Sequence, residues 1–410
     1  MKILHVNITY NRGSTGVIVE DLHNMSMKEG FDSYVTYSNT SLPEDKIVNG
    51  YQIGNVLGKK MHGLLSRIGG KQGYFSHLST RKLIKHIDKV SPDIVHLHNL
   101  HGNFLHVNML LDYLGKKNIS TVVTLHDCWL FTGGCTHYTI SKCDKWLDKC
   151  GGCPKNSSHT PAYIYDASAS ILRDRKKYFG KIKNLTVVGV SNWITSEANK
   201  TFFSKSNSVT IHNGIDNDFF CPTESDLKKQ LNIEDKFVIL GFAKKWLLEE
   251  NKKAFETVTK GIPNDAVMVL FGCNESEKAQ LPPNVIGMDF IRDRDTLRKL
   301  YSMGDVFANC TRQESLSLIN VEVQSCGTPI VTYRNTGAKE TVDNESSFSV
   351  EDGNAEEMLS RILEIKQNGK SKYSEQCRKF VREKFNRQEN YEKYISLYRS
   401  IAENTSEVKE

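Results

Sequence analysis

Two glutamates, Glu314 and Glu322, stand eight positions apart in the second half of the chain. We expect the first in a loop after a buried strand and the second inside the following helix. Between them, the backbone N–H groups of Ser315, Leu316 and Ser317 would lead into the start of that helix, where free donors and the helix dipole attract phosphate. Glu322 would accept hydrogen bonds from a ribose diol, and Glu314 from sugar hydroxyls. This segment therefore predicts a site for a nucleotide diphosphate carrying a sugar.

Two lysines are candidate ligands for the same phosphates. Lys244 closely follows an expected strand, and Lys253 stands in the helical stretch after it. Lysine suits phosphate as a mobile point charge, and it stabilises negative charge that develops on a leaving nucleotide. The alternative is that both lysines belong to an exposed basic surface.

In the first half of the chain, polar side chains follow two expected strands. His98 and His101 come at the end of one strand, and His126 and Asp127 come directly after the next. Open parallel sheets bind ligands at the carboxyl ends of their strands, so these positions are typical of a site. We predict a functional role for His126, while His98 and His101 are either structural or on the acceptor side together with Asp127.

A turn after the first expected strand contains Gly13 and Gly16. Glycine lets a backbone approach a ligand closely, and the helix expected to begin at Val17 would point its N-terminus at that ligand. The turn lacks the Gly-x-Gly-x-x-Gly pattern of dinucleotide sites, so it does not predict NAD. Gly16 is therefore a candidate contact for a ligand at this turn.

Four of the ten cysteines stand within 19 residues, at Cys135, Cys143, Cys150 and Cys153. The last two have the spacing of a zinc knuckle, and four thiolates would hold together a loop that lacks an obvious core. The cluster predicts structural zinc, with buried or redox-active thiols as the alternative. We expect no catalytic cofactor, because nothing here resembles a metal site with an open coordination position.

The elements that position these residues follow an α/β pattern. Short β-branched runs alternate with helical periodicity along all 410 residues, which is too long for one ordinary core. We expect two Rossmann-like, doubly wound parallel-sheet domains facing a cleft, with a C-terminal helix that returns to the first domain. The expected strands are 3–8, 33–37, 94–98, 121–125, 185–190, 237–242, 267–272, 285–290, 306–310 and 329–333. The expected domains are 1–205, with a cysteine-rich loop near 128–155, then 206–375 and a helical segment 376–410.

Charge is unevenly distributed, although the net charge of +6 is modest and does not indicate nucleic acid. Residues 58–87 carry seven lysines and arginines and no acidic residue. A basic, partly apolar segment of this kind predicts peripheral contact with an anionic membrane surface. The alternative is a solvated loop and helix whose apolar residues fill the core. No run is apolar enough to span a membrane or to act as a signal peptide, so we expect a cytoplasmic protein at the inner face of the plasma membrane.

Residues 300–340 resemble the Glu-x7-Glu region of retaining family-4 glycosyltransferases, which have the GT-B fold. The chain keeps both glutamates, the Cys-Gly-Thr-Pro run at 326–329, and Gly337 with Glu340. It departs from the family at Ser315 and Ser317, where glycine is usual. The histidine segments at 96–102 and 124–135 resemble a bacterial subgroup from exopolysaccharide, colanic-acid-like and capsule clusters.

This resemblance implies transfer of a sugar from a UDP- or GDP-sugar to a glycan or lipid-linked glycan, with retention of configuration. It implies that His126 and Glu314 lie at the reacting centre and that Lys244 and Lys253 contact the diphosphate. It also implies that the turn with Gly16 lies beside the donor diphosphate or the acceptor. The family usually has an arginine just after Gly241, and this chain has none. Two alternatives remain, a sugar-nucleotide epimerase of the same fold and a catalytically silent scaffold protein.

Overall fold

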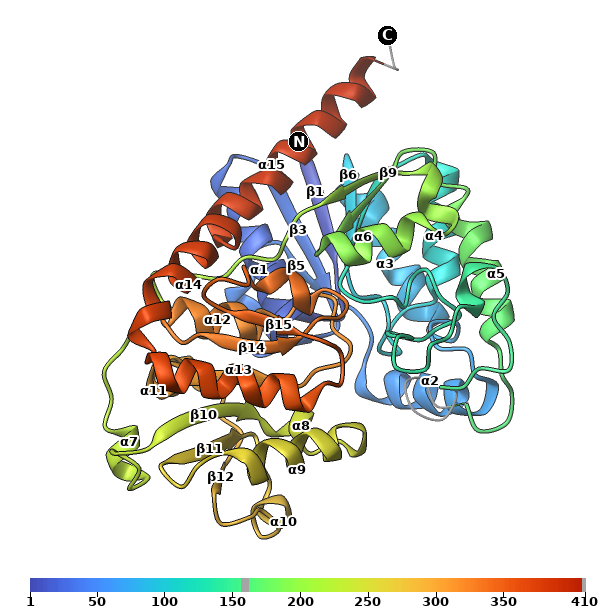
Figure 1. The fold of residues 1–410 in the computed structure, drawn as a ribbon. Helices are drawn as coiled ribbons and strands as arrows, with labels where there is room; N and C mark the ends of the chain where they lie inside the picture. The colour runs from blue at the N-terminus through green and yellow to red at the C-terminus, as the bar shows by residue number, and fades with distance from the viewer. Residues whose placement is uncertain (156–161, 408–410) are drawn as a thin grey trace. The chain divides into compact units, whose positions relative to one another are not determined.

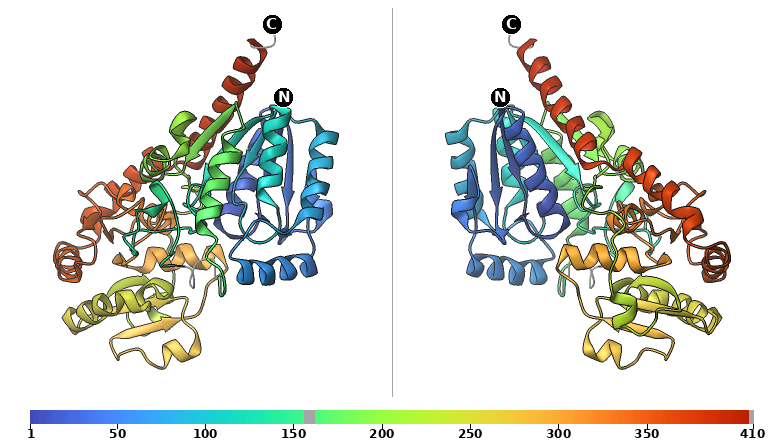
Figure 2. Two further views of the ribbon diagram at one scale, coloured as in Figure 1. Left: turned by 90° about the vertical axis from the view of Figure 1, so that its right-hand side faces the viewer. Right: turned by 90° about the vertical axis from the view of Figure 1, so that its left-hand side faces the viewer.

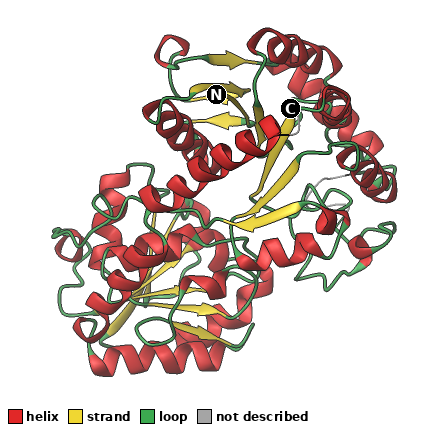
Figure 3. Cartoon of the chain, turned by 90° about the horizontal axis from the view of Figure 1, so that it is seen from above, coloured by secondary structure: helices red, strands yellow, loops and turns green. Residues whose placement is uncertain are grey.

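The computed structural model describes residues 1–155 and 162–407, and it divides into two compact units. Unit 1 comprises Met1–Ile211 and Tyr391–Glu410, and unit 2 comprises His212–Asn390. Each unit is built on a parallel β-sheet with helices packed on both faces (Figures 1 and 3). The expected class of two Rossmann-like α/β domains is confirmed.

The sheet of unit 1 has seven strands in the order β5-β3-β1-β6-β7-β8-β9, and every pair is parallel. The strands are β1 (Lys2–Val6), β3 (Asp32–Tyr37), β5 (Gly50–Gln52), β6 (Ile94–Leu97), β7 (Ser120–Leu125), β8 (Leu185–Gly189) and β9 (Asn207–Thr210). The short β2 (Thr9–Tyr10) and β4 (Asn39–Thr40) form a separate pair. The register sets His5 of β1 beside His96 of β6.

The helices of unit 1 are α1 (Gly13–Lys28), α2 (Val56–Gly69), α3 (His77–Val90), α4 (Val107–Lys117), α5 (Ser168–Phe179) and α6 (Asn192–Asn199). Helix α1 begins at Gly13 rather than at the expected Val17. Its first turn is made of glycine and hydroxyl residues, so no apolar periodicity marks where the helix begins.

The sheet of unit 2 has six parallel strands in the order β12-β11-β10-β13-β14-β15. The strands are β10 (Phe237–Phe242), β11 (Ala266–Phe271), β12 (Val285–Met288), β13 (Val306–Asn309), β14 (Ile330–Tyr333) and β15 (Phe348–Val350). The helices are α7 (Leu227–Gln230), α8 (Ala243–Trp246), α9 (Lys252–Gly261), α10 (Glu275–Lys278), α11 (Arg294–Met303), α12 (Leu318–Ser325), α13 (Ala355–Asn368) and α14 (Ser371–Lys384).

The last helix, α15 (Arg387–Glu407), belongs to unit 1 from Tyr391 onward, as expected of a C-terminal helix that returns to the first domain. It buries Tyr394 and Tyr398 completely. The Tyr398 hydroxyl lies 2.7 Å from Nδ1 of His96, and the Tyr394 hydroxyl lies 3.2 Å from Thr124 Oγ1. The helix is thus attached to unit 1 by polar contacts within the core.

Chain order reverses beside the first strand of each sheet. Strand β1 lies between β3 and β6, and β10 lies between β11 and β13. Open α/β sheets bind ligands beyond the carboxyl ends of strands at such reversals. Among the described residues, no helix is both long enough and apolar enough to cross a membrane.

Candidate functional site

In unit 2, Glu314 lies in the loop between β13 and α12. Its carboxylate forms an ion pair with Lys245, with 3.1 Å between Lys245 Nζ and Glu314 Oε1. Its backbone N–H donates to Thr336 Oγ1 at 3.1 Å, and its carbonyl accepts from the N–H of Gly337 at 3.0 Å. Loops that follow three neighbouring strands, β10, β13 and β14, therefore meet around this residue. The other carboxylate oxygen, Oε2, is buried without a hydrogen-bond partner among the described residues.

The loop after Glu314 enters helix α12 as the sequence predicted. The helix begins at Leu318, directly after the buried Ser317. Asn309, at the end of β13, donates from Nδ2 to Ser317 Oγ at 3.2 Å and to Asn320 Oδ1 at 2.8 Å. These buried bonds hold the first turn of α12 against the strand. Ser315 Oγ is buried and has no hydrogen-bond partner in the described part of the chain.

Glu322 lies in α12, one turn beyond its start, and is partly buried. Burial raises the pKa of Glu322 to about 7, although the charge of Arg294 and a hydrogen bond from Tyr301 oppose that rise. The Tyr301 hydroxyl lies 3.4 Å from Glu322 Oε2. Glu322 thus titrates near neutral pH, and its carboxylate is held by few partners from its own chain.

The lysines of unit 2 pair with different carboxylates, and the contacts of Lys244 and Lys253 with a diphosphate stay predictions. Lys245, which the sequence did not single out, contacts Glu314. Lys244 instead pairs with Glu277, at 3.0 Å from Oε1. Lys253 projects from α9 with 83% of its side chain exposed and lies 4.0 Å from Glu356. Adjacent residues of a helix point in different directions, so Lys244 and Lys245 of the one-turn helix α8 reach different carboxylates.

In unit 1, three imidazole rings form a row from the sheet interior toward the carboxyl ends of the strands. His5 Nδ1 lies 3.4 Å from His98 Nε2, and His98 Nδ1 lies 3.3 Å from His126 Nε2. Burial lowers the pKa of His5 to about 3 and that of His126 to about 4, and it holds the pKa of His98 well below the ordinary value. All three rings are therefore neutral near pH 7.

A neutral imidazole has one donor nitrogen and one acceptor nitrogen. The two contacts in the row consequently couple the tautomers of His5, His98 and His126. Because Nε2 of His126 faces His98, its Nδ1 is the ring nitrogen left for another partner. His98 thus orients His126, and the sequence analysis had left open whether His98 was structural.

His101 and Asp127 form a second pair on the same edge of unit 1, with 2.9 Å between His101 Nε2 and Asp127 Oδ2. Burial opposes both charges, but the hydrogen bond and mutual attraction raise the pKa of His101 and lower that of Asp127. The other oxygen of Asp127 accepts from the Trp129 N–H at 2.8 Å. The four predicted residues of the first half thus form two contacting pairs, His98 with His126 and His101 with Asp127.

The turn glycine Gly16 has a packing role. A Cβ atom at this position would lie 2.9 Å from Thr9 Oγ1, so glycine allows α1 to approach β2. The N–H of Asn11 also donates to the Gly16 carbonyl at 3.0 Å. The structure thus gives Gly16 a packing role, and its contact with a ligand stays a prediction.

The four clustered cysteines line one small pocket with a volume of about 20 Å³, together with Trp146 and Lys145. All are free thiols and partly buried. Among the described residues, only His5, His96 and His98 bring three potential ligand atoms within 4.8 Å of one another, so the cysteine sulphurs are more widely spaced than this. Those three histidines are already in contact with each other or with Tyr398 and Thr124.

Known structures share this fold across almost the whole chain. A sucrose-phosphate synthase from Thermosynechococcus elongatus matches with a TM-score of 0.69 and 15% identity over 98% of both chains. HepE of Anabaena, solved in complex with UDP and glucose, matches with a TM-score of 0.65 and 16% identity over 98% of this chain and 100% of HepE.

Sequence comparisons add the family. A model described as Glycosyltransferase Family 4 matches residues 16–219, and one described as Glycosyl transferases group 1 matches residues 223–384. The chain is a glycosyltransferase of the GT-B fold. A colanic acid biosynthesis glycosyl transferase, WcaC by name, from Escherichia coli (strain K12) is 21% identical over 98% of this chain and 100% of its own length.

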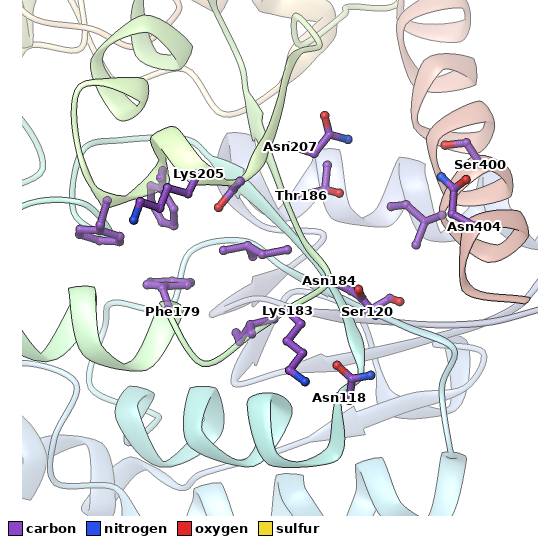
Figure 4. Close-up of a pocket in the computed structure, with 17 residues that line it drawn as sticks. Asn118, Ser120, Phe179, Lys183, Asn184, Thr186, Lys205, Asn207, Ser400 and Asn404 are labelled. Carbon is purple, nitrogen blue, oxygen red and sulfur yellow. The ribbon is translucent and has the colours of Figure 1, made fainter. Parts of the chain in front are cut away.

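The glycosyltransferase also has a pocket of about 590 Å³ in unit 1 that contains none of the predicted residues (Figure 4). Its lining includes Ser120, Leu185 and Asn207, the first residues of β7, β8 and β9. It therefore lies at the amino ends of these strands, opposite the edge that carries His98 and His126.

Asp216, Asp293 and Asp295, which belong to two runs of the form Asp-x-Asp, contact partners from the same chain. Asp216 forms an ion pair with Arg387 at 2.8 Å. Asp293 caps α11 by accepting a hydrogen bond from the Thr296 N–H at 2.8 Å. Asp295 pairs with Lys299 at 2.6 Å. These carboxylates have structural roles in the glycosyltransferase.

The raised pKa of Glu322 leads to a prediction about stability. Its folded-state pKa of about 7 exceeds the ordinary 4.5, so the folded chain binds this proton more tightly than the unfolded chain does. The free energy of unfolding must then fall as pH rises between these two values. We expect Glu322→Gln to raise the free energy of unfolding by about 1–3 kcal/mol at about pH 8, and to leave it nearly unchanged at about pH 4.

Urea unfolding at the two pH values measures this difference, with Glu356→Gln as the matched control because Glu356 is 66% exposed. A Glu322→Gln variant that is less stable than the wild type at alkaline pH would contradict the assignment.

Proposed function

We propose that this glycosyltransferase moves a sugar from a UDP- or GDP-sugar to a glycan or lipid-linked glycan acceptor during synthesis of a bacterial surface polysaccharide. The reaction retains anomeric configuration and needs no metal ion. The enzyme acts in the cytoplasm at the inner face of the plasma membrane, with peripheral contact through residues 58–87. The observation that carries the proposal is the contact between Lys245 and Glu314 at the start of α12.

Unit 2 supplies the donor side. Phosphate oxygens would be bound by the N–H groups from Ser315 to Ser317 and by the first turn of α12, where the helix dipole adds attraction. Glu322 would accept hydrogen bonds from the ribose diol. Lys245 lies 3.1 Å from Glu314, so its ammonium can stabilise charge on the leaving diphosphate while Glu314 contacts the sugar. The complex of HepE with UDP and glucose supports a donor of this class.

Unit 1 supplies the acceptor side. His126 would contact the reacting sugar through Nδ1, since its Nε2 is engaged by His98 at 3.3 Å. Being neutral, it can hold a hydroxyl without adding charge. The His101–Asp127 pair offers an imidazole and a carboxylate to acceptor hydroxyls. The name of the Escherichia coli relative supports a role in polysaccharide synthesis.

Retention requires no enzymic nucleophile in this proposal. The leaving phosphate itself takes the proton of the acceptor hydroxyl as the new bond forms on the same face of the sugar. Metal independence is consistent with Asp216, Asp293 and Asp295, which are engaged with residues of their own chain. In this proposal the Lys245 ammonium stabilises the negative charge of the leaving diphosphate, as a metal ion does in metal-dependent enzymes.

Turnover assays distinguish transfer from the alternatives. With UDP-glucose or GDP-mannose, a transferase releases nucleoside diphosphate only when a lipid extract carrying glycan acceptors is added. An epimerase converts the donor sugar without any acceptor, and a scaffold protein leaves the donor unchanged. Either of the last two results contradicts the proposal.

Substitution of Lys245 tests its proposed contact with the diphosphate most directly. We expect Lys245→Ala to lower kcat/KM by about tenfold or more, because a charge-assisted contact to phosphate is lost. Lys253→Ala is the matched control and should change kcat/KM less than about twofold, since that side chain is 83% exposed. An equal or larger effect at Lys253 would assign the diphosphate to the residue that the sequence predicted.

We also propose that Cys135, Cys143, Cys150 and Cys153 bind a structural zinc ion. They surround one pocket large enough for a single ion, and a tetrahedral set of four cysteine thiolates is a common structural zinc site. Zinc would draw the sulphurs closer than they lie now and would stabilise a loop with little core of its own. Redox-active thiols are the competing interpretation.

Metal analysis of the protein purified under reducing conditions tests this proposal. We expect one equivalent of zinc that is lost in Cys150→Ser, together with a lower melting temperature. Cys273→Ser is the control, because this cysteine lies in unit 2 and should leave the zinc content unchanged. Zinc-free protein whose stability does not respond to added zinc or chelator would contradict the proposal.

A further inference from the structure

Helix α2 is folded with its apolar side toward solvent. Five large side chains lie at helical spacing on its outer face, with exposed fractions of 72%, 58%, 59%, 40% and 41% for Leu57, Met61, Leu64, Leu65 and Ile68. This is the spacing that a helix normally turns toward a core. The alternative that the apolar residues of this segment fill the core is therefore wrong for α2.

The inner face of α2 is polar instead. His62 and Ser66 are the buried residues of the helix. His62 Nδ1 lies 2.6 Å from Ser76 Oγ, and His62 Nε2 accepts from the Gly73 N–H at 3.1 Å. Lys59 donates to Asn39 Oδ1 at 2.6 Å. These specific contacts fix the rotation of the helix, so its outward apolar stripe is a constrained feature of the fold.

A neighbouring loop extends the apolar surface. Tyr163, Ile164 and Tyr165 are exposed by 71%, 62% and 65%. The Tyr163 N–H donates to the carbonyl of Arg67 in α2 at 2.7 Å, which fixes this loop beside the end of the helix. We call the five α2 residues together with residues 163–165 the α2 surface. Contiguous exposed apolar patches of this kind mark interaction sites.

The positive charge around the α2 surface favours an anionic partner. No aspartate or glutamate occurs between Lys46 and Ile87, and Lys60 and Arg67 are exposed on α2 itself. Apolar side chains bordered by cations complement a lipid bilayer with anionic headgroups. We propose that the α2 surface inserts its apolar side chains into an anionic membrane, with α2 lying parallel to the bilayer plane.

The orientation of α2 within unit 1 links this surface to the acceptor side, a link that rests on the proposed function. The helix runs across the carboxyl ends of the strands (Figure 2). Ser66 Oγ donates to Asn103 Oδ1 at 3.4 Å, and Asn103 lies in the β6–α4 loop that also carries His101. A lipid-linked acceptor in the docked membrane would thus present its glycan next to the His101–Asp127 pair.

Vesicle sedimentation of the full chain tests the proposal. We expect the wild type to bind phosphatidylcholine–phosphatidylglycerol vesicles about tenfold or more tightly than pure phosphatidylcholine vesicles. The triple variant Leu57→Gln/Met61→Gln/Leu64→Gln should lose binding to both. Lys60→Gln/Arg67→Gln should lose only the preference for the anionic vesicles. Val48→Gln is the matched control, since Val48 is exposed by 58% outside α2 and should bind like the wild type.

All of the substituted side chains are exposed, so the variants should keep the wild-type melting temperature, which is measured in parallel. Wild-type protein that ignores both vesicles, or a triple variant that binds them equally well, overturns the proposal. So does a wild-type dimer that the triple variant converts to monomer, because the surface would then bind a second copy. Vesicle binding needs no turnover, so its outcome is separate from that of the transferase assay.

Discussion

Parallel pairing of the strands in both sheets is the constraint on which the rest of the structure depends. It gathers all the carboxyl ends of a sheet on one edge, and the chain reversals beside β1 and β10 leave room there for loops to meet. In unit 1 that edge carries His126, and in unit 2 it carries Glu314 and Lys245. The pocket in Figure 4 lies at the amino ends of its strands and therefore contains none of these residues.

The second constraint is the burial of groups that would otherwise be charged. Burial costs an ionised group its hydration, so His5 and His98 stay neutral and bond to each other, while Glu322 holds its proton up to about pH 7. The contact between His5 and His98 restricts their rings to matching tautomers. The raised pKa of Glu322 lowers the free energy of unfolding as pH rises. A nucleotide bound at Glu322 would recover that cost, which is the usual relation between stability and function at a binding site.

The positions of the site residues along the fold could be predicted from the sequence, but the directions of their side chains could not. Strand β10 was expected with its observed bounds, and His126 and Glu322 were placed correctly at a strand end and inside a helix, because apolar periodicity carries that information. Lys245 was missed because a one-turn helix has no periodicity that tells adjacent lysines apart. The sequence left open whether the apolar residues of α2 face a membrane or the core, because an apolar stripe on a helix is compatible with both. The bonds of His62, which turn the polar face inward, are not visible in the sequence.

The most direct test of the central claim is thermal unfolding of the purified protein with UDP, GDP, CDP and ADP, and with their sugars. A ligand at about 100 times its Kd adds about 2.7 kcal/mol to the stability of the folded state, which is a readily visible shift. If unit 2 holds a nucleoside diphosphate as described, one base will stabilise the wild type and will fail to stabilise Glu322→Ala. If no nucleotide stabilises the wild type, or if Glu322→Ala responds equally, the donor site is not at α12 and the account is wrong.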